Sequence, residues 1–134
     1  MFELSQDHEE FRSLVREFAE AEIEPRVAAW DRAEHFPVEL IPKLGDLGVF
    51  GLVVPHEYGG SRRAEGESHG GDFTMLCVAI EELGRVDQAI GITLEAAVGL
   101  GINPILSYGT SDQKERWLPD LAAGRALAGF GLTE

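Results

Sequence analysis

The sequence is poor in cysteine and in positive charge. Its single cysteine, Cys77, excludes any disulfide within the chain and fits a reducing cytoplasm. Lysine and arginine together number 11, against 24 aspartates and glutamates, and the formal net charge is −13 at pH 7. Such a chain lacks the basic footprint that nucleic acids and anionic membrane surfaces attract. We therefore expect a cytoplasmic protein with no nucleic-acid partner.

Long apolar runs and familiar catalytic motifs are also missing. No uninterrupted apolar run approaches the ~20 residues that a membrane-spanning helix needs, and the acidic first ten residues do not have the pattern of a secretory signal. The sequence has no nucleophile elbow, phosphate-binding loop or zinc-protease motif. The four histidines show no metal-ligand spacing. We predict no membrane span and no metal site.

The first third of the chain has the pattern of amphipathic helices. Apolar residues recur at three- and four-residue steps from Phe11 to Ile23, which is typical of a helix with one buried face. Ser5 is placed to cap its start, and Pro25 is expected to kink or restart the helix. A second helix is predicted to begin at Phe36-Pro37, because proline suits the first helical position.

The middle of the chain combines a short apolar run, a polar loop and a strongly apolar helix. Val49–Val54 is too short for a helix of its own and is predicted to be extended. Ser61–Asp72 is polar and rich in glycine, so we expect a mobile loop. Asp72 can cap the helix that follows.

That apolar helix contains the cysteine and three charged residues. Cys77 has apolar neighbours on both sides in the sequence and is predicted to be a buried core thiol. Glu81, Glu82 and Arg85 are predicted to form the wet side of the helix. Because Glu81 and Glu82 are adjacent, their side chains diverge on a helix and do not form a catalytic carboxylate pair.

The last third is predicted to hold two more helices. Asp87 can cap a helix over Gln88–Leu100, and the stretch Gly101–Pro104 is expected to break it. Ser111 is predicted to cap a final helix, which Gly124 is placed to stop. With these helices the pattern predicts an all-α fold, an up-and-down bundle of about five or six helices in a single domain over residues 1–134.

Two segments allow more than one interpretation. The helix over Gln88–Leu100 is apolar nearly all round, and its small residues suit either a central core helix or a slot for an apolar ligand. After Gly124 the chain becomes small and apolar through Ala126–Leu132, and it stops as an extended segment begins. A chain of this kind is expected to be part of something longer.

Nearly the whole chain resembles the N-terminal helical domain of the acyl-CoA dehydrogenases. Each matching motif is weak alone, but together they occur in the right order and at sensible spacing. In chain order the matching residues are Val15-Arg16-Glu17-Phe18-Ala19, Ile23-Glu24-Pro25, Trp30-Asp31, Phe36-Pro37, Leu44-Gly45, Leu47-Gly48, Val54-Pro55, Glu57-Tyr58-Gly59-Gly60, Glu81-Glu82-Leu83, Pro104-Ile105, Gly109-Thr110, Gln113-Lys114-Glu115-Arg116-Trp117-Leu118-Pro119 and Leu132-Thr133-Glu134. In one departure, the polar loop after Gly60 looks longer than is usual in the family.

The resemblance implies a flavoprotein oxidoreductase of fatty-acid or branched-chain catabolism. It implies that FAD is the cofactor, that acyl-CoA thioesters are desaturated between the α and β carbons, and that electrons pass to an electron-transferring flavoprotein. It also implies a middle β-domain and a C-terminal helical domain, neither of which lies in this chain, and a homo-oligomer, either a dimer or a tetramer. The catalytic base would belong to the C-terminal domain, so no catalytic residue is expected here.

Two sets of residues match functional positions of that family. Phe130, Leu132 and Thr133 correspond to the segment that touches the flavin ring, with Thr133 placed to hydrogen-bond its pyrimidine edge. A second set corresponds to the helix that lines the acyl-chain pocket. It consists of Thr93, Ala96, Ala97 and Leu100.

Other functions stay open at this stage. A stand-alone helical interaction module without catalysis is one alternative. An acyl-CoA oxidase, or a desaturase that acts on carrier-protein thioesters, would use the same scaffold.

Overall fold

The computed structural model describes residues 3–133, and its regular structure there is helical. The α-helices are α1 (Gln6–Phe18), α2 (Val27–Arg32), α3 (Leu40–Asp46), α4 (Phe73–Val86), α5 (Gln88–Ala96), α6 (Asn103–Tyr108) and α7 (Ser111–Ala122). Ala19–Ile23 and Ala97–Ile102 are π-helical, and Val49–Gly51 and His56–Tyr58 form short 3₁₀ turns. Since α5 and α6 are joined into one rod, these seven helices make six rods. The all-α prediction is confirmed.

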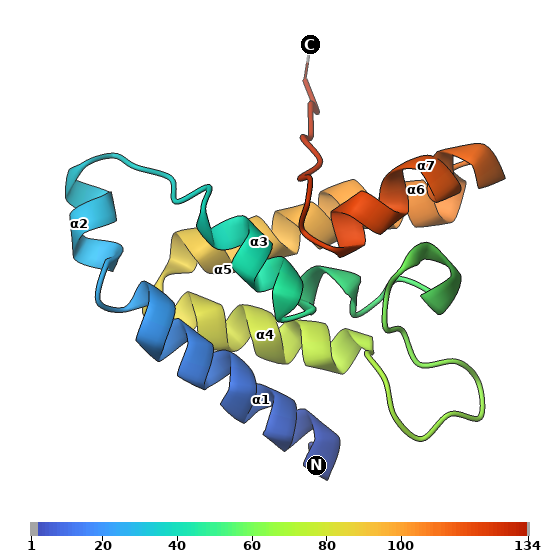
Figure 1. Ribbon diagram of the computed structural model, residues 1–134, viewed down its shortest axis with the longest axis horizontal. Helices are drawn as coiled ribbons and strands as arrows, with labels where there is room; N and C mark the ends of the chain where they lie inside the picture. The colour runs from blue at the N-terminus through green and yellow to red at the C-terminus, as the bar shows by residue number, and fades with distance from the viewer. Residues whose placement is uncertain (1–2, 134) are drawn as a thin grey trace.

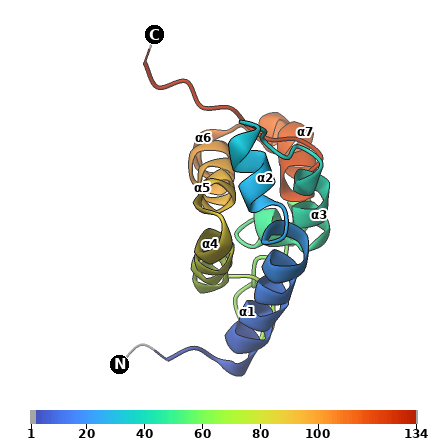
Figure 2. The ribbon, with the colours of Figure 1, turned by 90° about the vertical axis from the view of Figure 1, so that its left-hand side faces the viewer.

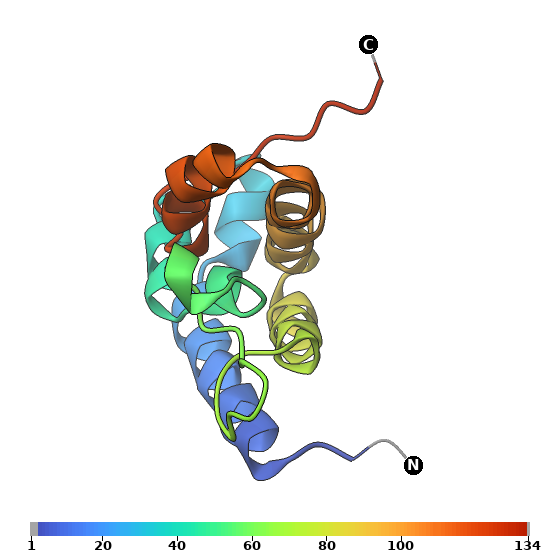
Figure 3. The ribbon, with the colours of Figure 1, turned by 90° about the vertical axis from the view of Figure 1, so that its right-hand side faces the viewer.

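The helices form two layers. Figures 2 and 3 show α4, α5 and α6 on one side and α1, α3 and α7 on the other, with α2 at one end between them. α4 and α5 run antiparallel because only Asp87 separates them, and α6 and α7 also reverse direction (Figure 1). The core between the layers is a single apolar cluster to which both layers contribute, including Val15, Leu44, Leu83, Leu94 and Leu118.

Three of the four predicted helix caps are found at the expected residues. Ser5 forms a capping box with His8 at the start of α1. The side chains of Asp72 and Asp87 accept hydrogen bonds from the backbone N–H groups of Met75 and Ala89 at the starts of α4 and α5. The prediction for α7 is wrong by one residue. Thr110 caps that helix, because its hydroxyl accepts from the N–H of Gln113 while the Gln113 side chain reaches back to Thr110.

The predicted break at Gly101–Pro104 is wrong. An uninterrupted helix runs over Gln88–Tyr108. Its π-helical turns at Ala97–Ile102 widen the backbone just before Pro104. Because the helical hydrogen-bond pattern already changes there, the missing N–H of the proline does not interrupt the helix.

By length and composition this helix of 21 residues could cross a bilayer, since an 18-residue window within it has a mean hydropathy of 1.6. The sequence pattern did not reveal this, because it ended the helix at Leu100. A core helix of a soluble protein meets the same criteria, and here the rod packs against α4 and α7.

Two boundaries in the first half also differ from the prediction. Helix α3 begins at Leu40, and Phe36-Pro37 lies before it in an irregular stretch that a turn at residues 38–39 joins to the helix. The run Val49–Val54 is not extended. It starts with a 3₁₀ turn that follows Gly48 in the left-handed region, with φ of +82°. This turn buries the Phe50 side chain completely, so the run contributes to the hydrophobic core.

Helix α4 corrects the predictions for Cys77 and Glu82. Cys77 is exposed on the outer face of the helix, so it is not a core thiol. Glu82 is 2% exposed and does not belong to the wet side. Its carboxylate accepts hydrogen bonds from Arg16 Nε at 2.9 Å and Nη2 at 2.7 Å, and it also lies 3.4 Å from Arg85 Nε. Glu82 therefore ties α4 to α1.

The hydrogen bonds from Arg16 hold the pKa of the Glu82 carboxylate below its ordinary value. A carboxylate with a lowered pKa stabilises the fold above its unfolded pKa of about 4.3, and this contribution is lost as the pH falls through the folded pKa. We expect Glu82→Gln to lower the free energy of unfolding by about 2 kcal/mol at neutral pH. Urea unfolding between neutral and acid pH should show the variant and the parent converging below about pH 4.

Glu81→Gln is the matched control, because that carboxylate is exposed and makes a single contact of 3.4 Å with Arg12. Its stability should follow the parent at every pH. A constant difference between Glu82→Gln and the parent down to acid pH would contradict the charge-based explanation.

Gly45 and Gly124 let α3 meet the end of α7 at backbone distance. A Cβ atom added at Gly45 would lie 2.1 Å from the carbonyl oxygen of Ala123 and 3.0 Å from the Cα of Gly124. Gly124 has φ of +66° and follows the last turn of α7, as predicted for a residue that stops the helix. Within that layer, α3 and the end of α7 therefore meet at a junction that has no room for side chains.

Candidate functional site

The four residues matched to an acyl-chain pocket share one face of the α5 rod. Thr93, Ala96, Ala97 and Leu100 follow the spacing of a helix stripe. Ala97 is buried, Thr93 and Ala96 are half-buried, and Leu100 is 40% exposed. The Thr93 hydroxyl donates to the carbonyl of Ala89 at 2.8 Å, so its own helix satisfies it. The face is therefore small and apolar and offers no charge.

The C-terminal tail begins beside this face. A Cβ atom added at Gly101 would lie 2.6 Å from the Cβ of Ala128, so glycine is needed where the tail crosses the π-helical turns. Ala128 is half-buried in the crossing and packs against the core. The sequence analysis missed both residues, because nothing local marks a contact between positions 27 residues apart.

The residues matched to a flavin-contacting segment lie further along the tail. Phe130 is 54% exposed and Leu132 is 81% exposed. Thr133 is also exposed. In all three ribbon views the tail leaves the helices and runs outward (Figures 1, 2 and 3). The structure thus brings the base of the tail to the α5 face and leaves Phe130, Leu132 and Thr133 projecting beyond it.

A cavity of about 300 Å³ lies under the base of the tail. Ile105 from α6, Trp117 and Leu121 from α7, and Leu127 and Ala128 from the tail form most of its wall. Trp117 is 42% exposed there. This cavity explains why an indole at that position remains accessible.

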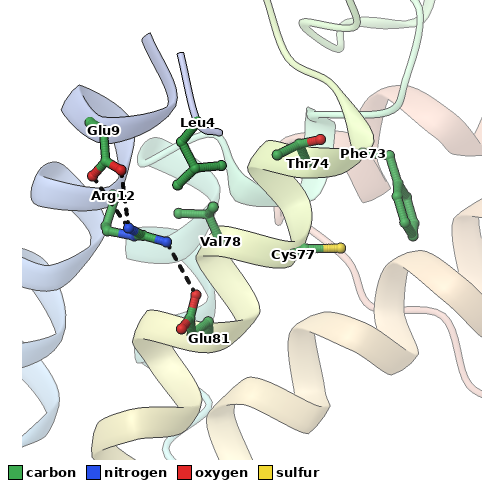
Figure 4. A pocket seen from close by; sticks show the side chains of 8 residues that line it. All are labelled: Leu4, Glu9, Arg12, Phe73, Thr74, Cys77, Val78 and Glu81. Atoms are coloured by element: carbon green, nitrogen blue, oxygen red, sulfur yellow. Dashed lines mark hydrogen bonds and ion pairs between the residues drawn. The ribbon is translucent and has the colours of Figure 1, made fainter. Parts of the chain in front are cut away.

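A larger groove, of about 640 Å³, runs between α1 and α4 and contains none of the predicted site residues (Figure 4). Arg12 bridges Glu9 and Glu81 across it at 3.2 and 3.4 Å. The Cys77 sulfur and the Phe73 ring point away from that bridge, toward the outer side of α4. The groove is therefore spanned by the Arg12–Glu81 ion pair, and its lining holds no organised reactive group.

The carboxylates of the described chain do not form an acid–base site. Glu82 has a lowered pKa and is held by arginines, and both properties make it a poor proton acceptor at neutral pH. Glu95 lies exposed on α5, where no other charged side chain is paired with it among residues 3–133. The same residues hold no cluster of histidine, cysteine or carboxylate groups suited to a metal ion. What the arrangement offers is an apolar face beside an outgoing tail.

Comparison with known proteins gives a consistent result. The sequence profile described as "Acyl-CoA dehydrogenase, N-terminal domain" matches residues 5–125. The probable acyl-CoA dehydrogenase YngJ of Bacillus subtilis is 40% identical over 133 residues, which is 99% of this chain and 33% of that protein.

Solved structures agree with the sequence match. Butyryl-CoA dehydrogenase from Megasphaera elsdenii superimposes with a TM-score of 0.88 at 38% identity, over 100% of this chain and 34% of that one. A chain from a study of the electron transferring flavoprotein of Acidaminococcus fermentans gives 0.89 at 38% identity, over 100% of this chain and 33% of that one. The chain thus spans about a third of the length of the relatives that it matches.

Proposed function

The chain belongs to the acyl-CoA dehydrogenase family, and from this we propose that it supplies the N-terminal domain of an FAD-dependent enzyme that desaturates acyl-CoA thioesters. In this proposal a double bond forms between the α and β carbons of the acyl group. The domain contributes one wall of the acyl-chain pocket and one wall of the flavin site. The remaining walls and the catalytic base belong to other domains of the same protein.

The observation that supports this function best is the crossing of the tail over α5. The Gly101–Ala128 contact brings the irregular tail, which carries the exposed Thr133, against the apolar rod that carries Ala96 and Ala97. An acyl chain needs an apolar face like that of the rod, and a flavin ring needs packing and hydrogen-bonding groups like those of the tail. An apolar helix face next to this tail suits a reaction in which an alkyl chain must lie against a planar cofactor.

The residues of this chain would bind and orient rather than react. Ala96, Ala97 and Leu100 would remove the acyl chain from water, and the small size of the two alanines would leave room for it. Phe130 would pack against the cofactor, and the Thr133 hydroxyl would hydrogen-bond its polar edge. When bound, FAD supplies the hydride acceptor that no amino-acid side chain provides.

Partners and location follow from the same proposal. We expect electrons to pass to an electron-transferring flavoprotein, and the whole protein to form a homo-oligomer, either a dimer or a tetramer, in the cytoplasm. The strongly acidic composition supports the exclusion of nucleic acid as a partner.

The test is an anaerobic titration of the whole protein that carries this domain. Addition of an acyl-CoA should bleach the visible flavin band, and adding an electron-transferring flavoprotein should restore it. Free fatty acid is the control and should leave the spectrum unchanged. A purified protein that carries no flavin and consumes no acyl-CoA would contradict the enzyme and favour a non-catalytic interaction module.

The acyl-pocket assignment can be tested by filling the small face of α5. In the whole protein, Ala96→Phe should shorten the longest acyl chain that is accepted, because the ring occupies the space of the terminal methylenes. Each methylene excluded should cost about 0.8 kcal/mol, roughly fourfold in affinity. The measurement is kcat/KM over a series of straight-chain acyl-CoA substrates.

Ala29→Phe is the matched control, since Ala29 is exposed on α2 at the other end of the bundle. It adds the same ring and should leave the chain-length profile unchanged. If both variants keep the parent profile, Ala96 and Ala97 are ordinary helix-packing residues and not pocket walls.

A further inference from the structure

The chain has few cations, and most of them are already paired with carboxylates. Among residues 3–133, ion pairs occupy Arg12, Arg16, Arg26, Lys43, Arg63, Arg85 and Arg125. That leaves Arg32, Arg62, Lys114 and Arg116 without a carboxylate partner in this part of the chain. Two of these four, Arg62 and Lys114, line the same cavity.

That cavity has about 590 Å³ and lies where the long polar loop meets the α6–α7 turn. Arg62 reaches it from the loop, and Lys114 reaches it from the first turns of α7. The 3₁₀ turn His56–Tyr58, which packs against α7, contributes the Tyr58 side chain. Figure 1 shows the His56–Tyr58 turn between this loop, which leads into α4, and the outer ends of α6 and α7. The volume is in the range of ligand pockets.

Arg63 adds a third cation with unused donors. Within residues 3–133, the only hydrogen bond of its side chain is a contact of 3.4 Å from Nη2 to Asp72, and its buried Nε has no partner there. Asp72 is occupied elsewhere, because it caps α4 through the N–H of Met75 and lies 2.9 Å from His8 Nε2. Glu57 is the other carboxylate in the lining. Three cations therefore face two carboxylates, in a chain whose net charge is −13.

We propose that this cavity binds a phosphate group, with Arg62 and Lys114 as its charged ligands and Arg63 as an additional donor. Guanidinium groups match the fork geometry of phosphate oxygens, and a lysine ammonium adds a mobile point charge. Tyr58 offers a ring face to whatever carries the phosphate. The loop that supplies both arginines is the segment in which the sequence departs from the family pattern. The proposal does not depend on the dehydrogenase activity.

The experiment titrates the ¹⁵N-labelled 134-residue chain with inorganic pyrophosphate, at constant ionic strength kept with sodium chloride, and follows amide chemical shifts. We expect saturable shifts confined to residues 55–63, 103–107 and the start of α7. Lys114→Gln and Arg62→Gln should each weaken binding about fivefold. Neither side chain forms an ion pair with the described residues 3–133, so thermal unfolding followed by circular dichroism should confirm that both variants remain folded.

Arg32→Gln is the matched control, because it removes the same charge from an unpaired arginine on α2, away from the cavity. It should bind pyrophosphate like the parent. A second arm compares free coenzyme A with pyrophosphate. Tighter coenzyme A binding assigns the site to a nucleotide-bearing ligand, and equal binding assigns it to a simple phosphate. Shifts that do not saturate, or equal weakening in Arg32→Gln and Lys114→Gln, would overturn the site and leave only diffuse charge.

Discussion

Replacing Gly45 with alanine is expected to lower the free energy of unfolding by about 3 kcal/mol, because the junction of α3 with the end of α7 has no room for a methyl group. The new Cβ would lie 2.1 Å from the Ala123 carbonyl oxygen and 2.8 Å from its carbon. Both atoms are backbone, so neither can rotate away as a side chain would. Relief requires α3 and α7 to separate, and this exposes the core between Leu44 and Leu118.

Thermal unfolding should show this as a fall in Tm of roughly 10 °C. Gly84→Ala is the matched control, because Gly84 also lies inside a helix but its added Cβ would meet only the end of the Gln88 side chain at 3.4 Å. Without a clash, alanine should be neutral or stabilise α4 by up to about 1 kcal/mol. A Gly45→Ala variant as stable as the parent would show that the two helices do not pack at backbone distance in solution.

The 134-residue chain alone is expected to bind no FAD tightly and to desaturate no acyl-CoA. Its tail supplies one side of a flavin site, with Phe130 for packing and the Thr133 hydroxyl for one hydrogen bond. One such bond adds about 1 kcal/mol, whereas immobilising a ligand costs ~4 kcal/mol or more. Away from the Arg62 and Lys114 cavity, the net charge of −13 also repels the diphosphate of the cofactor.

The measurement is a titration of the chain with FAD, followed by flavin fluorescence and the visible spectrum. In the whole protein the tail should matter, and Thr133→Val should weaken FAD retention and slow flavin reduction. Micromolar quenching by the chain alone, or bleaching with acyl-CoA, would show that these residues contain a complete active site.

Local chemistry in the sequence was enough to predict most of the helices. The caps at Ser5, Asp72 and Asp87 depend on one side chain and the next three backbone groups, so the local sequence is enough to predict them. The wrong predictions concern residues whose structure depends on features that the neighbouring sequence does not show. Pro104 looked like a helix breaker because the π-helical turns before it leave no sequence signature. Glu82 looked solvated because its arginine partner lies 66 positions away.

The candidate site was only partly accessible to the same reasoning. The periodicity of α5 placed Thr93, Ala96, Ala97 and Leu100 on one face, but their assignment to an acyl pocket came from family resemblance. Neither source revealed the Gly101–Ala128 crossing, which depends on how a tail folds back over a helix. The pocket and flavin roles of these residues stay predictions until the variants are measured.

The outgoing tail has a practical consequence for anyone who handles this chain. Ala126–Thr133 contains no charged residue and no proline, and residues 127–133 make no backbone hydrogen bond within the described chain. Such a segment can pair through its free backbone groups with the same segment of another copy. The shared negative charge keeps copies apart only in dilute salt, because at 0.15 M the Debye length shrinks to about 8 Å. Low ionic strength and an N-terminal affinity tag should therefore give the cleaner monomer.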